Sequence, residues 1–105
     1  MVTHSFHNPL NELKDFYSDT LENSDNTYDK ESASTGLKTL ESIDRFIKKY
    51  ETKKEKKHLK RIHSLLATLS RGIEFFNDFE TNERHNELGI HVYTLREEIE
   101  KELNW

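Results

Sequence analysis

The chain contains no cysteine, only three glycines and a single proline. The absence of cysteine excludes disulfide bonds, thiolate zinc sites and cysteine nucleophiles. It is also compatible with a reducing cytosol. The scarcity of glycine and proline argues against a β-sheet, which needs turn residues at short intervals. The sequence is instead rich in leucine, glutamate and lysine, which favour helices.

No apolar run approaches the length of a membrane span, and residues 1–9 lack the basic and apolar regions of a signal peptide. We therefore expect a soluble, cytoplasmic protein, with secretion by a route that needs no such peptide as the alternative. The 105 residues fit a single domain, 1–105, with a small core. Such a core gains stability from helical contacts or from a second copy in a homodimer.

Two amphipathic helices are predicted in the first half of the chain, over 9–22 and 36–50, because apolar residues recur three or four positions apart. Asn8 can cap the first helix, and Ser34 or Thr35 the second. Residues 1–7 carry no apolar periodicity, so we expect them to form a frayed tail. The polar stretch 23–34 predicts a loop. The apolar positions are Leu10, Leu13, Tyr17 and Leu21, then Leu37, Leu40, Ile43, Ile47 and Tyr50.

Two further helices are predicted over 53–79 and 83–104. A capping-box pattern from Thr52 to Glu55 favours a tight turn before the third helix, with one continuous helix as the alternative. Gly89 lies inside the fourth helix and suggests a close contact there. Together these elements predict an all-α antiparallel bundle. The apolar positions are Leu59, Ile62, Leu66, Leu69, Ile73 and Phe76, then Leu88, Val92, Leu95, Ile99 and Leu103.

The net charge of −4 conceals a basic cluster between residues 48 and 61. Eight basic and two acidic residues give that segment +6, whereas residues 1–47 and 62–105 each carry −5. The cluster could hold an acidic partner, phosphate or an anionic membrane surface, or it could simply be a solvated turn. Nucleic acid is disfavoured because both flanks would repel it. The basic residues are Lys48, Lys49, Lys53, Lys54, Lys56, Lys57, Lys60 and Arg61.

Aromatic residues exceed what a narrow helical seam needs, and they suggest a surface for a partner protein. Phe75 and Phe76 are adjacent, so one helix cannot easily turn both toward the same neighbour. Phe79 would extend such a patch, and Trp105 would lie at an end of the bundle or in a partner. Filling of the core is the alternative role for these side chains.

Metal and cofactor sites find little support in the sequence. Glu55 and His58 have the Glu-x-x-His spacing of di-iron bundles, but the chain holds no second such motif. His58 also lies among lysines, which would repel a cation. Glu87 and His91 share a helical face, where a helix-stabilising contact is commoner than metal ligation. We therefore expect no metal and no cofactor.

The segment 84–91 carries the one enzyme-like pattern. Arg84 and His91 lie seven positions apart, or two helical turns, so both side chains share a face. An arginine there can hold a phosphate while the imidazole moves a proton. The spacing resembles the Arg-(x4–6)-His motif of HEPN-type ribonucleases, which are small helical bundles, and His85 matches the polar residue that commonly follows the arginine. The resemblance implies a ribonuclease using Arg84 and His91, although the chain is short for that family.

Three functions remain open from the sequence. The first is a non-enzymatic interaction module, such as an adaptor, inhibitor or small regulatory subunit, that binds another protein through a helical surface. The second is the HEPN-like ribonuclease. The third is an electrostatic binder of nucleic acid or an acidic partner through residues 48–61.

Overall fold

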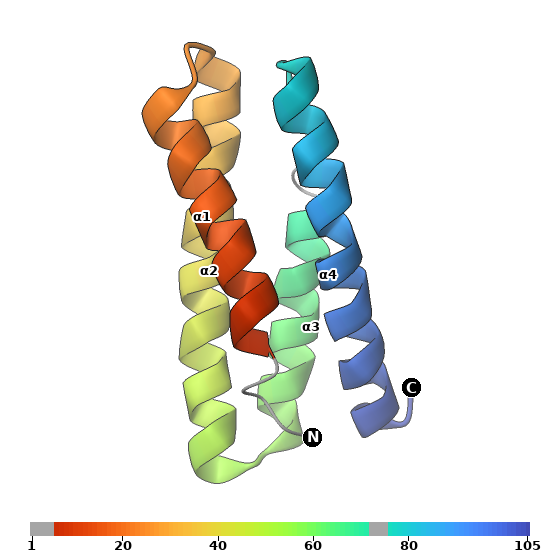
Figure 1. Ribbon diagram of the computed structural model, residues 1–105. Helices are drawn as coiled ribbons and strands as arrows, with labels where there is room; N and C mark the ends of the chain where they lie inside the picture. Colours follow the sequence, from red (N-terminus) through yellow and green to blue (C-terminus); the bar gives the residue numbers. More distant parts are fainter. Residues whose placement is uncertain (1–5, 72–75) are drawn as a thin grey trace.

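The structure is a computed structural model that describes residues 6–71 and 76–105. Within these ranges the chain forms four α-helices and no strand: α1 (His7–Asn23), α2 (Thr27–Lys53), α3 (Lys56–Arg71) and α4 (Phe79–Leu103). Successive helices run antiparallel in an elongated body with extents of 42 × 21 × 20 Å (Figure 1). The predicted all-α antiparallel bundle is confirmed.

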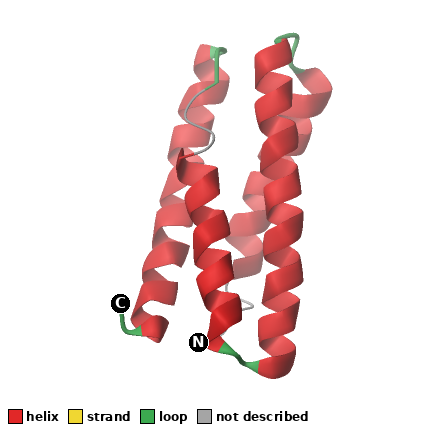
Figure 2. Ribbon diagram, turned by 180° about the vertical axis from the view of Figure 1, so that it is seen from behind, coloured by secondary structure: helices red, strands yellow, loops and turns green. Residues whose placement is uncertain are grey.

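The two ends of the bundle are built from different elements. One end holds the turn between α1 and α2 together with the start of α4. The opposite end holds the turn between α2 and α3 and the end of α4, and the shorter helix α1 begins part of the way toward it (Figure 1). The view from behind shows the same division (Figure 2).

Large apolar side chains from all four helices form one core, because each helix turns a stripe of them inward. In α3 and α4 the buried apolar positions from Leu59 to Leu69 and from Leu88 to Leu103 follow the predicted spacing of three and four residues, while the predicted position Ile73 lies outside the described residues. Fully buried members of the core, each at most 1% exposed, include Phe6, Leu13, Tyr17, Leu40, Ile43, Ile47, Leu59, Ile62, Leu66, Leu69 and Ile99.

The first helix begins earlier than predicted. Phe6 is buried and His7 is already helical, so the predicted tail 1–7 is wrong at these two residues, while residues 1–5 lie outside the described ranges. Asn8 is not the cap, because the N-cap position is Phe6 and no side chain caps the helix there. Pro9 falls within the first turn, where a missing N–H costs nothing.

The second helix begins at Thr27, so the predicted loop 23–34 and helix 36–50 are wrong in their boundaries. Asn26, and not Ser34 or Thr35, caps α2 by accepting from the backbone N–H of Asp29 at 3.0 Å. The inward positions keep a regular alternation of four and three residues, but the first three are not large and apolar. The buried positions in this series are Asp29, Ala33, Gly36, Leu40, Ile43, Ile47 and Tyr50.

A tight turn separates α2 from α3, as predicted, but it does not use the predicted capping box. Thr52 lies inside α2, where its hydroxyl donates to the carbonyl of Lys48. Lys54 ends α2 in the left-handed conformation, with φ 58° and ψ 26°. Its backbone N–H donates to the carbonyl of Tyr50 at 2.7 Å.

The third helix is shorter than the predicted 53–79, and the fourth is longer than the predicted 83–104. Phe76 is buried but not helical, and Phe79 already belongs to α4. Asp78 caps α4, accepting from the backbone N–H of Thr81 at 3.0 Å. The predicted close contact at Gly89 is wrong, because nothing lies within 4 Å of a Cβ placed there.

Candidate functional site

The turn between α2 and α3 carries the cluster of positive charge that composition predicted. Its eight basic residues, called the basic end below, are all exposed. The Nζ atom of Lys57 lies 3.1 Å from the carboxylate of Glu55, and this contact lowers the pKa of the Glu55 carboxyl. The basic end comprises Lys48, Lys49, Lys53, Lys54, Lys56, Lys57, Lys60 and Arg61.

One aromatic ring draws together cations from both helices at the basic end. Phe46 lies partly buried on α2. The ammonium of Lys49 lies 4.7 Å from its ring centroid, and the guanidinium carbon of Arg61 lies 5.8 Å from the same centroid. Such cation–π contacts hold long side chains that would otherwise be mobile.

The Glu55–His58 spacing does not build a metal site. His58 is buried beside Phe46, with ring centroids 6.3 Å apart, while the Glu55 carboxylate contacts Lys57. The Nε2 atom of His58 is buried without a hydrogen-bond partner among the described residues. Across residues 6–71 and 76–105, no three His, Cys, Asp or Glu side chains are grouped so that they could hold a metal ion.

Arg84 and His91 both lie on α4, and each has a carboxylate partner. The guanidinium of Arg84 lies 3.4 Å from Glu87, one turn along the same helix. The Nε2 atom of His91 lies 2.7 Å from the carboxylate of Glu12 on α1. A phosphate placed beside either side chain would therefore also face a carboxylate. Glu87 pairs with Arg84, so the predicted Glu87–His91 contact is not the one that forms.

His85, predicted only as a match to the ribonuclease motif, is instead part of a buried aromatic cluster. Its Nε2 atom lies 3.0 Å from the hydroxyl of Tyr17. Its ring stacks on Phe16 and meets Phe76 edge to face, with centroids 5.7 and 5.0 Å apart. Burial lowers the pKa of His85 and raises the pKa of Tyr17. These groups join α1 to α4 and are enclosed in the fold.

The predicted aromatic patch is not one surface. Phe75 lies outside the described residues. Phe79 begins α4 and is 72% exposed, whereas Trp105 follows the end of α4 and is 62% exposed. The two side chains therefore lie at opposite ends of α4, which is 25 residues long. Trp105 also turns back toward α3, where its ring meets His63 edge to face at 5.0 Å.

Two exposed apolar side chains of α4 were not predicted from the sequence. Ile90 is 64% exposed and Tyr93 is 62% exposed. Phe79 lies eleven residues before Ile90, which is close to three helical turns, so the three side chains share one side of α4. We call this the outer face of α4. It lies opposite the side that is buried through Leu88, Val92, Leu95, Ile99 and Leu103.

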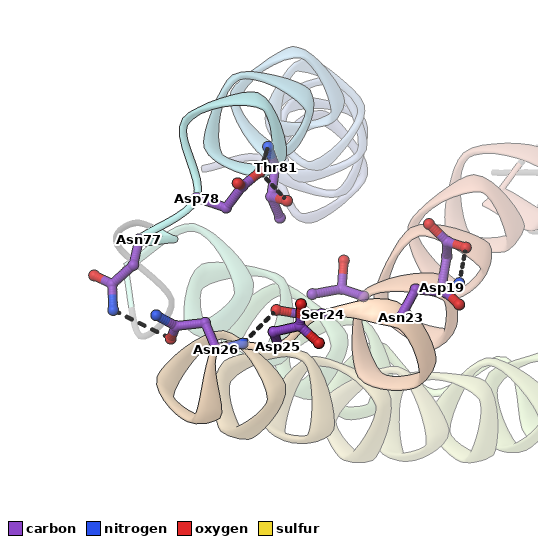
Figure 3. Close-up of a pocket in the computed structure, with 9 residues that line it drawn as sticks. Asp19, Asn23, Ser24, Asp25, Asn26, Asn77, Asp78 and Thr81 are labelled. Carbon is purple, nitrogen blue, oxygen red and sulfur yellow. Dashed lines mark hydrogen bonds between the residues drawn. The ribbon is translucent and has the colours of Figure 1, made fainter.

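An open polar cavity of about 420 Å³ lies at the opposite end from the basic residues. Figure 3 shows side chains from the α1–α2 turn on one side and from the start of α4 on the other. Asn77 donates to Asn26 across it at 3.2 Å, and Asp78 is held by Thr81. Its polar side chains contact one another and tie the turn to α4. The lining residues are Asp19, Thr20, Asn23, Ser24, Asp25, Asn26, Asn77, Asp78 and Thr81.

Comparison of the chain with models of known protein families, with curated proteins and with solved structures found no match. Among the described residues, no helix is both long enough and apolar enough to cross a membrane.

Proposed function

We propose that the protein is a non-enzymatic interaction module that binds another protein through the outer face of α4. The observation that carries the proposal is the exposure of Phe79, Ile90 and Tyr93 on one side of a helix whose other side faces the core. Exposed large apolar side chains gain most when a partner removes them from water. An adaptor, inhibitor or regulatory subunit would use such a surface.

The local chemistry of the outer face supports a protein partner. Tyr93 presents an apolar ring, and a hydrogen bond with Glu97, one turn further along, raises the pKa of its hydroxyl. Tyrosine is among the residues that contribute most to interfaces, because a large ring is combined with a polar group. Ile90 lies one turn before Tyr93, so a helix or a strand of a partner could contact both.

Site-specific photo-crosslinking in the cells that make the protein tests this proposal. A photoreactive phenylalanine analogue is placed at position 90 or at position 93, and at the exposed position 38 on α2 as a control. We expect a discrete adduct from positions 90 and 93 that is absent from position 38. An adduct of twice the chain's own mass would identify the partner as a second copy. Equal labelling from all three positions, or none from α4, would contradict the proposal.

A further inference from the structure

The basic end keeps positive charges that the fold itself does not neutralise. Apart from Lys57, which pairs with Glu55, none of its cations has a carboxylate within 4 Å among the described residues. Lys49 and Lys53 are four residues apart on α2, and Lys56 and Lys60 are four residues apart on α3. Like charges at this spacing destabilise a helix. The arrangement therefore costs the fold stability, and an anionic ligand would offset that cost.

Cation–π contacts within the basic end also hold several of its charged side chains in place. Phe46 holds Lys49 of α2 and Arg61 of α3 over one ring, so two helices present cations at the same place. Lys54, in the turn itself, lies with its ammonium 5.4 Å from the ring centroid of Tyr50. Cations already held in place lose less conformational freedom when a ligand binds.

We infer that the basic end binds a short acidic segment of a partner protein. The cluster covers about six residues on each of two helices, or roughly 9 Å along each axis. Beyond it, residues 1–47 and 62–105 each carry a net charge of −5. Burial raises the pKa of the Tyr50 hydroxyl, and the nearby negative charge of Glu102 raises it further, so negative charge begins close to the cluster. A long nucleic-acid backbone would meet that negative charge, whereas a short acidic segment would not.

The inference goes beyond the proposed function, because it assigns a second surface at a different place on the bundle. The two surfaces can be tested separately, since neither Ile90 nor Tyr93 belongs to the basic end. Failure of the experiment below would leave the outer face of α4 as the proposed interaction site.

Binding of a fluorescein-labelled oligoglutamate peptide, followed by fluorescence anisotropy, tests the inference. The variant Lys56→Glu/Lys60→Glu removes two exposed cations of the basic end. The matched control Lys30→Glu/Lys38→Glu makes the same change in net charge at exposed positions of α2 outside the basic end. We expect the first variant to lose about tenfold or more in affinity and the control to change less than about twofold. Circular dichroism confirms that both variants remain helical.

Two further measurements complete the experiment. Affinity for the peptide should fall as salt rises from about 50 to about 300 mM, because salt screens exposed charges. An RNA oligonucleotide of equal charge should bind more weakly than the peptide. Affinity that is flat with salt, equal losses in both variants, or tighter binding of the RNA would overturn the inference.

Discussion

The ring of Tyr17 lies directly against the backbone of Gly36, so that a Cβ added at position 36 would come within 2.6 Å of the Cε2 atom of Tyr17. Tyr17 is fully buried and cannot easily move aside. Gly36→Ala should therefore destabilise the protein by roughly 1–3 kcal/mol, although alanine is the better helix former. Chemical denaturation followed by circular dichroism measures the change. The double variant Tyr17→Leu/Gly36→Ala should show a favourable coupling between the two sites.

Gly89 provides the matched control for that substitution. It also lies inside a helix, but nothing would contact a Cβ added there. Gly89→Ala should raise the free energy of unfolding by about 0.5–1 kcal/mol, because only the helix propensity changes. If both substitutions stabilised the protein, the close approach of Tyr17 to α2 would be wrong.

Helical spacing and the two glycines show which features the sequence predicts and which it does not. Helical periodicity located the core of α3 and α4, where the buried positions are large and apolar apart from His58 and His85. It missed the first nine residues of α2, because their inward positions, Asp29 and Ala33, contribute little apolar surface. A search for spacing alone, without regard to size, would have extended the helix. Which glycine lies against a neighbouring ring depends on tertiary contacts, and no local pattern gives that information.

The candidate surfaces were predictable to different degrees. The basic end follows from simple counting of charges, since adjacent residues on a turn stay together in any fold. The outer face of α4 was not predicted, because Ile90 and Tyr93 lie on the opposite side of the helix from the apolar stripe that predicted it. The break after α3 was predicted too late in the chain, at residues 80–82. Phe76 and Phe79 fit the helical spacing, but Asp78 can cap a new helix between them.

The buried pair of Tyr17 and His85 should make stability depend on pH. Burial lowers the pKa of His85 below its ordinary value of 6.5, so the unfolded chain takes up a proton first as pH falls. The free energy of unfolding should therefore be highest above about pH 6.5 and decline below it. Burial of Tyr17 raises the pKa of its hydroxyl, which predicts a second loss as pH rises above about 10.

Urea denaturation at a series of pH values measures this dependence, with His85→Phe as the comparison. The variant keeps an aromatic ring in the cluster but cannot titrate. It should be less stable at neutral pH, because the hydroxyl of Tyr17 loses its partner. Its stability should also fall less steeply than that of the wild type between pH 6.5 and pH 5. Parallel curves for the two proteins would show that His85 is not held neutral by the fold.

Asp29 should be the polar side chain whose loss damages the fold most. It is 0% exposed, and its carboxylate accepts from the backbone N–H groups of Asn77 at 2.6 Å and Asp78 at 3.0 Å. Asp29→Ala would leave both donors without their partner, at a cost of about 3 kcal/mol. Asp25→Ala, at an exposed position of the turn just before α2, should change stability by less than about 0.5 kcal/mol. Thermal denaturation of the two variants compares them, and similar melting temperatures would contradict the role given to Asp29.

The left-handed residues that end α2 and α4 give a final prediction. Lys54 and Asn104 have φ values of 58° and 60°, a conformation that glycine adopts without strain. Lys54→Gly should stabilise the protein by about 1 kcal/mol. Asn104→Gly should stabilise it less, because asparagine tolerates this conformation better than lysine does. Urea denaturation measures both changes. Lys54→Gly also removes one cation of the basic end, so it should bind the oligoglutamate peptide more weakly while folding more stably. Tighter binding would contradict the contribution of Lys54 to the basic end, and a loss of stability would contradict the strain assigned to its left-handed conformation.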